Sequence, residues 1–233
     1  MIKGSINRAL KDLRSLLFMD LCIGCYNREP VSGKLFCLSC LVDIPYIKTQ
    51  ESIPSLLIGK ADLPTEIDTF YSLLTYGKSG LIKTVIDSLK YRSRPDIGVK
   101  LGGQLAETMR PHLPPDPILI PVPLHPKRQH ERGYNQAHKI AEGISTLLDI
   151  SINDTILKRI QYNESQTKKS AQERKGVKDQ KFSLQKNINV NTSHHAIIVD
   201  DIITTGSTIS ACYHLLKEVG FKNISVATLA ITI

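Results

Sequence analysis

Two adjacent carboxylates close an apolar run in the stretch HHAIIVDDIITTGSTIS, residues 194–210. A strand over this run would deliver Asp200 and Asp201 to the carboxyl edge of a sheet, where α/β proteins bind ligands. Small, hydroxyl-rich residues follow and then lead into a helix, so backbone N–H groups and hydroxyls can surround a phosphate there. These residues are Thr204, Thr205, Gly206, Ser207 and Thr208. Carboxylates for vicinal hydroxyls and a loop for a phosphate together indicate a ribose 5-phosphate.

Other readings of this stretch explain less of it. A Walker loop ends in Gly-Lys-Ser/Thr and a dinucleotide fold needs GxGxxG, and the stretch has neither. A phospho-receiver domain needs a further aspartate well beyond the acidic pair, and no aspartate follows Asp201. A solvated strand end with a helix cap accounts for Thr or Ser, but not for two carboxylates at a buried edge.

A second loop also follows a buried strand, in LIPVPLHPKRQHERGYNQA. It gathers basic side chains into a short loop before a helix: His125, Lys127, Arg128, His130 and Arg132. Basic side chains and free amides are what a pyrophosphate with its Mg²⁺ requires. The alternative is an ordinary solvated basic turn, which the position directly after a strand disfavours.

Four cysteines near the start have the spacing of a metal site. In CIGCYNREPVSGKLFCLSC, Cys22 and Cys25 form one C-x2-C pair, and Cys37 and Cys40 form the other. Each pair can aim two sulfurs at one point, which suits a tetrahedral zinc ion. Four thiolates leave no open coordination position, so the sequence predicts structural zinc rather than a redox pair. The fifth cysteine, Cys212, is expected to be a buried small hydrophobe on a helix.

The elements that position these residues alternate along the chain. Strands are expected in TFYSLLTY, PILIPVP, DTILKRI, HAIIV and ISVATLAITI, and helices over residues 79–91, 96–110, 134–148 and 206–219. Apolar strands alternating with helices predict an α/β fold, a parallel sheet with helices on both faces. Residues 41–68 are expected to be an irregular connection. We therefore divide the chain into an N-terminal helix with a zinc-finger-like module at 1–68 and a second domain at 69–233.

Composition is that of a soluble globular protein, with 41% hydrophobic and 22% charged residues. The net charge of +8 favours anionic partners such as nucleotides, nucleic acid or a membrane surface. Charged residues interrupt the N-terminal segment, which therefore lacks a secretory signal, and we expect a cytoplasmic protein. Ile2, Ile6, Leu10, Leu13 and Leu17 share one helix face. This basic amphipathic helix suits docking on the protein's own core, or peripheral contact with the inner face of the membrane.

The acidic stretch resembles the phosphoribosyl pyrophosphate (PRPP) motif of type I phosphoribosyltransferases. This resemblance implies a type I phosphoribosyltransferase fold in which Asp200 and Asp201 hold the ribose hydroxyls, near Mg²⁺, and Thr204–Thr208 hold the 5-phosphate. It also implies that the second loop, with Leu124, His125, Lys127, Arg128 and Arg132, binds pyrophosphate. The cysteine knuckle, PVPLHPKR, RGYNQA and the PRPP motif together are similar to the ComF family of competence-associated proteins over nearly the whole chain.

Further residues agree with the ComF pattern or depart from it. Tyr76 and Lys90 stand at the places that the family pattern expects. In the loop NESQTKKSAQERKGVKDQKF, Gln166, Arg174 and Phe182 keep the family spacing, whereas Lys169 and Val177 depart from it.

Two functions follow from this resemblance. The chain is expected to bind PRPP and to handle imported single-stranded DNA in the cytoplasm during natural transformation, with competence or recombination proteins as partners. Cations that would track the phosphate backbone gather in one loop: Lys168, Lys169, Arg174, Lys175 and Lys178. Alternatively, the chain is an active Mg²⁺-dependent transferase that moves 5-phosphoribose from PRPP to an acceptor such as a nucleobase. The sequence names no nucleophile and no general base.

Overall fold

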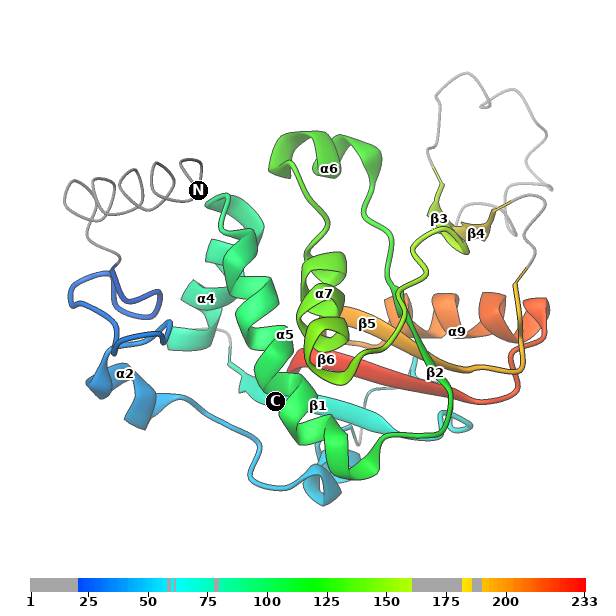
Figure 1. Ribbon diagram of the computed structural model, residues 1–233, viewed down its shortest axis with the longest axis horizontal. Coiled ribbons are helices and arrows are strands. Elements are labelled where there is room, and N and C mark those ends of the chain that lie inside the picture. The colour runs from blue at the N-terminus through cyan, green and yellow to red at the C-terminus, as the bar shows by residue number, and fades with distance from the viewer. Residues whose placement is uncertain (1–20, 58–59, 61, 78–79, 161–181, 186–189) are drawn as a thin grey trace, which may run out of the picture.

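A four-stranded parallel sheet forms the centre of the protein. We describe a computed structural model, covering residues 21–57, 60, 62–77, 80–160, 182–185 and 190–233 (Figure 1). The strands are β1 (Phe70–Tyr76), β2 (Pro117–Pro121), β5 (His195–Ile203) and β6 (Ile224–Thr232), in the order β1-β6-β5-β2. All three neighbouring pairs are parallel. The central β6 is buried along eight consecutive residues, as expected for a sheet covered on both faces.

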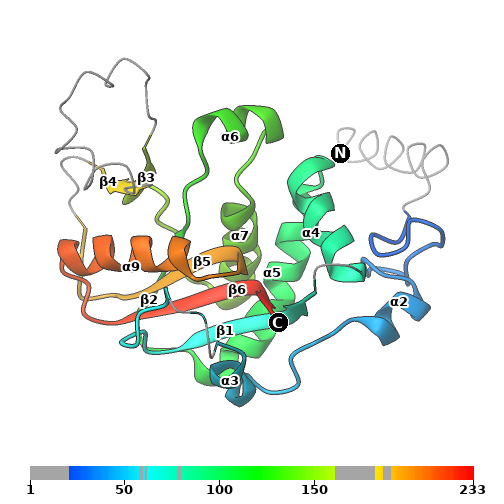
Figure 2. The same cartoon turned by 180° about the vertical axis from the view of Figure 1, so that it is seen from behind.

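Helices cover both faces of this sheet, which confirms the α/β fold. On one face lie α4 (Leu81–Tyr91), α5 (Pro95–Met109) and α7 (Gln136–Leu148), in front of the sheet in Figure 1. On the other lie α9 (Ser207–Val219) and the short α3 (Ile53–Leu57), which come forward in Figure 2. Two apolar clusters result, one on each face.

The backbones of α5 and α7 touch at two glycines. A Cβ atom at Gly143 would lie 2.1 Å from the carbonyl oxygen of Val99, and one at Gly102 would lie 2.2 Å from that of Ile140. Only a residue without a side chain fits at such distances. This close approach fixes α7, and with it the turn that connects α7 to the second loop.

One predicted strand leaves the sheet. The segment DTILKRI was expected among the parallel strands, but β3 (Leu157–Arg159) instead pairs antiparallel with β4 (Phe182–Leu184) in a separate ribbon. Its alternation explains this, because Leu157 is buried whereas Lys158 is exposed, and a strand covered on both faces needs a continuous apolar run. A single parallel bridge between Ile152 and Leu119 extends the sheet beside β2 in its place.

The cysteine module packs directly on α4. Ile23 and Phe36 are almost fully buried in the same apolar cluster as the residues of α4. The Tyr26 hydroxyl is hydrogen-bonded to the hydroxyl of Ser88, and the Arg92 guanidinium carbon lies 4.3 Å from the centroid of the Tyr26 ring. The module and α4 therefore share one core.

The connection after the cysteines is more regular than expected. It contains α2 (Leu38–Asp43), the 3-10 turn η1 (Gln50–Ser52) and α3, although its prolines suggested an irregular segment. The Gln50 side chain replaces a strand partner for β1, since its amide donates to the Ser72 carbonyl at 3.1 Å and accepts from the Ser72 N–H at 3.3 Å. A second 3-10 turn, η2 (Arg110–His112), follows α5.

Candidate functional site

The two aspartates lie at the carboxyl edge of the sheet, among the last residues of β5 rather than after its end. The strand was expected to stop at the acids, but its ladder continues to Ile203. Successive side chains of a strand point to opposite faces. Asp201 is 8% exposed, whereas Asp200 is partly exposed, and the Asp201 N–H donates to Asp200 Oδ1 at 2.8 Å.

A positive charge acts on each carboxylate, through an ion pair at Asp201 and through a longer-range interaction at Asp200. On the α4 side, Lys90 Nζ lies 2.9 Å from Asp201 Oδ2. On the α9 side, the guanidinium of Arg159 interacts electrostatically with Asp200. In the sequence, Arg159 stands out in no motif and Lys90 only by its place in the family pattern, because neither residue lies next to the acidic motif.

The pKa of Asp200 is strongly raised. Burial is the main cause and the charge of Asp201 the second, while Lys90 and Arg159 oppose the shift, so that the pKa reaches about 7. A carboxyl group with this pKa sits near the point of ionisation at neutral pH. The pair therefore favours a ligand that brings positive charge or hydroxyl donors to it.

The hydroxyl-rich turn after β5 is held open by a glycine. Gly206 has a positive φ of 97° and is the N-cap of α9, which no side chain caps. A Cβ atom there would lie 2.5 Å from Leu63 Cγ. Thr204 and Thr205 are exposed, Ser207 and Thr208 are partly exposed, and the Ser207 N–H donates to Thr205 Oγ1 at 3.3 Å. Hydroxyls and N–H groups of the first helical turn thus face outward, as a phosphate requires.

The second loop reaches the same edge of the sheet. Val122 follows β2 and donates its N–H to the Val199 carbonyl at 2.9 Å, so the segments after β2 and β5 start side by side. The expected loop is itself helical, as α6 (Pro126–Arg132), because His125 caps it by accepting from the Lys127 N–H at 3.2 Å. Its amides therefore serve the helix more than a ligand.

The basic residues of α6 have different surroundings. The Arg132 guanidinium carbon lies 4.9 Å from the centroid of the Tyr91 ring at the end of α4. Lys127 and Arg128 are exposed and form no ion pair with the residues that the structure describes. Leu124 and His125 are partly exposed, and Leu124 contributes to a cavity of about 390 Å³ with Tyr134. The anion-binding capacity of this loop thus rests on Lys127 and Arg128.

The four predicted metal ligands converge. The sulfurs of Cys22, Cys25, Cys37 and Cys40 all lie within 4.8 Å of one another, and those of Cys25 and Cys37 are 3.9 Å apart. Tetrahedral zinc with bonds of about 2.3 Å separates its sulfurs by about 3.8 Å, so the donor set fits. Burial would raise the pKa of Cys22, but N–H groups of the knuckle lower it to about 6, which favours the thiolate that zinc binds.

Other predicted residues lie elsewhere. Cys212 is fully buried on α9, as expected. The cations Lys168, Lys169, Arg174, Lys175 and Lys178, together with Gln166 and the amphipathic segment 1–20, fall outside the described residues. Among the helices that the structure describes, none is long and apolar enough to cross a membrane.

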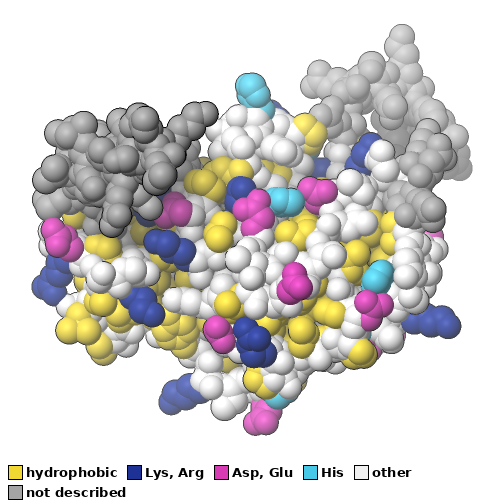
Figure 3. Space-filling model, in the orientation of Figure 1, with side chains coloured by type: hydrophobic (Ala, Val, Ile, Leu, Met, Phe, Trp, Pro, Cys, Tyr) yellow, Lys and Arg dark blue, Asp and Glu magenta, His cyan; other side chains and the backbone are white. Residues whose placement is uncertain are grey.

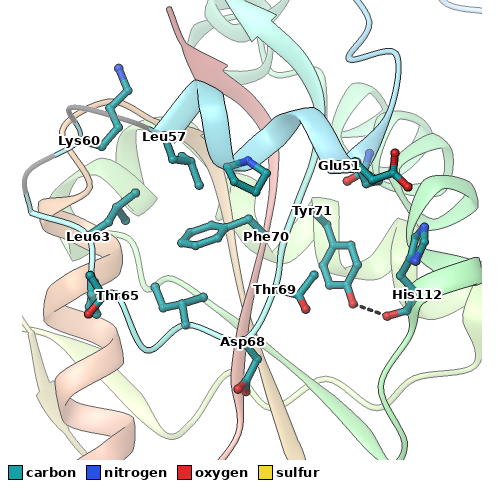
Figure 4. Close-up of a pocket in the computed structure, with 14 residues that line it drawn as sticks. Glu51, Leu57, Lys60, Leu63, Thr65, Asp68, Thr69, Phe70, Tyr71 and His112 are labelled. Carbon is teal, nitrogen blue, oxygen red and sulfur yellow. Dashed lines mark hydrogen bonds between the residues drawn. The ribbon is translucent and has the colours of Figure 1, made fainter.

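A cavity also lies away from the acidic pair. It measures about 680 Å³ and lies against the amino end of β1, between α3 and the segment that leads to β1 (Figure 4). Phe70 and Tyr71 line it, and the Tyr71 hydroxyl donates to the His112 carbonyl at 2.6 Å. Leu63 belongs both to this lining and to the contact with Gly206. Leu63 therefore lines the cavity and also packs against the hydroxyl-rich turn after β5.

Comparison with known proteins assigns the segment that carries the acidic pair to a domain family. Residues 134–231 match the phosphoribosyl transferase domain. Competence protein F of Haemophilus influenzae is 39% identical over 112 residues, 48% of this chain and 49% of that protein. Competence protein ComFC of Bacillus subtilis is 30% identical over 161 residues, 67% of this chain and 61% of that protein.

DNA utilization protein YhgH of Salmonella typhi is 26% identical over 157 residues, 65% of this chain and 68% of that protein. The chain thus spans about half the length of the first of these relatives, and about two thirds of the other two. Among solved structures, a hypoxanthine phosphoribosyltransferase from Staphylococcus aureus is similar with a TM-score of 0.34 and 15% identity, over 61% of this chain and 65% of that one.

The parallel sheet, the acidic pair at its carboxyl edge and the matched residues define a protein with a phosphoribosyltransferase domain. An N-terminal four-cysteine cluster precedes this domain. This cluster and these relatives support a ComF family protein.

Proposed function

We propose that this protein binds PRPP with Mg²⁺ at the carboxyl edge of its sheet. Asp200 and Asp201 hold the ribose 2- and 3-hydroxyls, Thr204–Thr208 hold the 5-phosphate, and Lys127 and Arg128 hold the pyrophosphate. The observation that carries this proposal is the acidic pair placed between an uncapped helix start and the basic α6. Carboxylate oxygens are hard donors that suit Mg²⁺, which would neutralise pyrophosphate charge when bound.

The role of this binding lies in the handling of imported single-stranded DNA in the cytoplasm during natural transformation. Relatives named competence protein F, competence protein ComFC and DNA utilization protein support it. The distribution of charge supports it as well. Lys and Arg alternate with Asp and Glu over the face seen in Figure 3. The described residues contain eighteen Lys or Arg and seventeen Asp or Glu, so nearly all of the +8 net charge belongs to the remaining sequence.

A charge-matched pair of variants tests DNA binding. In the first, Lys168, Lys169, Arg174, Lys175 and Lys178 are changed to Gln. In the second, five exposed cations of the described surface are changed to Gln: Lys34, Lys48, Lys100, Lys158 and Lys222. Anisotropy of labelled single-stranded DNA is measured over a salt series. Each lost phosphate contact flattens the slope of log K against log salt by about 0.7, so the first variant should lose affinity and slope. Equal losses in both variants would assign binding to net charge alone, and no binding at low salt would refute the proposal.

The second candidate function is transfer of 5-phosphoribose from PRPP to an acceptor such as a nucleobase. The specific observation in its favour is the raised pKa of Asp200 beside two cations, since perturbed carboxylates cluster at reactive sites. The bond from ribose C1 to pyrophosphate would break, with the electron pair leaving on pyrophosphate, while an acceptor nitrogen bonds to C1 and gives up its N–H proton to solvent. The carboxylates would steady positive charge on the ribose, while Lys127 and Arg128 would stabilise the leaving group. Pyrophosphate release with a panel of nucleobases tests this function.

A further inference from the structure

Arg159 occupies a built position beside the acidic pair. It is the last residue of β3 and lies directly opposite Phe182 of β4 in the ribbon. The Phe182 ring is 1% exposed and belongs to the apolar cluster under α9, together with Cys212. The Arg159 guanidinium carbon lies 4.5 Å from the centroid of this ring. The buried ring therefore acts as a platform that fixes the height of the guanidinium above the sheet.

Within the described part of the chain, the donors of this guanidinium have no partner. Arg159 is partly buried, yet it forms no hydrogen bond and no ion pair with any residue in the described part of the chain. Arg94, by comparison, makes two hydrogen bonds of 2.8 Å to Asp96. A guanidinium carries five N–H donors, and partly buried donors without a partner are costly. Such a group suits an anion that arrives from outside the protein.

Its charged neighbours point to the same conclusion. Burial is the first cause that lowers the pKa of Arg159, and the positive charge of Arg128 is the second, while Cys212 and Asp200 oppose them. Two guanidinium groups from different elements, β3 and α6, thus repel each other, and the charge of Asp200 partly offsets this repulsion at Arg159. A ligand with several negative charges between them would remove this repulsion.

We propose that Arg159 and Arg128 form a two-arginine clamp for the pyrophosphate group of the bound phosphoribosyl ligand, with Phe182 as the platform of the clamp. This inference rests on the proposed PRPP binding and adds a residue that neither the motif nor the second loop contains. Arg128 approaches from the α6 side and Arg159 from the ribbon side. Arg159 is then a binding residue for the half of the ligand that lies beyond the ribose.

Two ligands that differ only in the pyrophosphate test the clamp. PRPP with Mg²⁺ and ribose 5-phosphate with Mg²⁺ are titrated by calorimetry into the wild-type chain, Arg159→Met and Arg159→Lys. The control is Lys158→Met, which removes one positive charge from the adjacent, exposed residue of the same strand. Charged hydrogen bonds are worth enough that Arg159→Met should weaken PRPP binding by at least about 10-fold. Ribose 5-phosphate affinity should stay within about 2-fold.

Other results of these titrations would overturn either the clamp or the proposed PRPP binding. Unchanged PRPP affinity in Arg159→Met would overturn the clamp while leaving PRPP binding in place. Equal loss of both ligands would also overturn it, because Arg159 would then act on the ribose through Asp200. Arg159→Lys keeps the charge without the fork and should lie between the wild type and Arg159→Met, and it carries the test if the Met variant does not fold. A wild-type chain that binds neither ligand would refute the proposed function itself.

Discussion

The ammonium group of Lys90 lies 2.9 Å from the carboxylate of Asp201, and this contact joins α4 to the functional edge of β5. The same helix carries the cysteine module, through the hydrogen bond of Ser88 to Tyr26 and the stacking of Arg92 on that ring. The cysteine module is therefore two contacts away from the acidic pair. Its position on α4 gives a structural reason why this module should matter to the acidic pair.

Replacing Lys90 should destabilise the protein more than replacing an exposed lysine of the same helix. Lys90→Met leaves Asp201 nearly buried without its cation, and we expect a loss of about 1–3 kcal/mol in the free energy of unfolding at neutral pH. Lys83→Met breaks the exposed pair with Asp87, which water screens, and should cost clearly less. Urea denaturation measures both. Equal effects would mean that the Lys90 pair is no stronger than a surface ion pair.

The raised pKa of Asp200 predicts a pH dependence of stability. A carboxyl group whose pKa is higher in the folded protein than in the unfolded chain takes up a proton on folding, so stability falls as pH rises from 3.8 to about 7. Asp200→Asn removes this loss. At pH 8 the variant should exceed the wild type by about 2–4 kcal/mol, with little difference at pH 4. Parallel unfolding curves across the pH range would show that Asp200 has an ordinary pKa.

Removal of zinc should weaken both the fold and ligand binding. Ile23 and Phe36 belong to the shared core with α4, so a collapsed knuckle would loosen the helix that carries Lys90. Elemental analysis should find about one zinc per chain in the wild type. Cys40→Ser should lose zinc, melt at lower temperature and bind PRPP more weakly, whereas Cys212→Ala should keep its zinc. Zinc retained in Cys40→Ser, or absent from the wild type, would contradict the assignment.

Gly206 allows a test of the proposed binding of the 5-phosphate by the turn Thr204–Thr208. Gly206→Ala places a Cβ atom 2.5 Å from Leu63 Cγ and forces alanine to a φ of 97°. We expect loss of PRPP affinity and a lower melting temperature. Adding Leu63→Ala removes the steric clash but not the backbone strain, so it should restore only part of both. Full PRPP affinity in the single Gly206→Ala variant would show that the turn does not bind the phosphate.

Sequence patterns predicted the parts of the fold that depend on local periodicity. The strand around Ile197 and the helix after Gly206 follow from apolar runs and a glycine start, and the four cysteines follow from their spacing. The pattern was wrong where tertiary pairing decides the outcome. Leu157 was expected in a strand of the parallel sheet, but it pairs antiparallel with Leu184, a residue more than twenty positions further along the chain.

The same distinction holds for the site. The acids and the hydroxyl turn are contiguous in sequence, so one motif reveals them together. Lys90 precedes Asp201 by more than one hundred residues, and Arg159 comes near Asp200 only because the ribbon folds back over α9. No local pattern marks Arg159, and only the resemblance to the ComF pattern singles out Lys90. The short helix α6 was missed because its prolines and clustered charges are typical of a loop, although Pro126 stands at the first helical position.

The most direct test of PRPP binding at the acidic pair is calorimetric titration of PRPP with Mg²⁺ into the wild-type chain and into a variant with Asp200→Asn and Asp201→Asn. PRPP should bind saturably to the wild type and not to the variant, with the zinc content unchanged. A folded, zinc-loaded variant that binds PRPP as tightly as the wild type would contradict this prediction, because the ribose would then lie elsewhere on the protein.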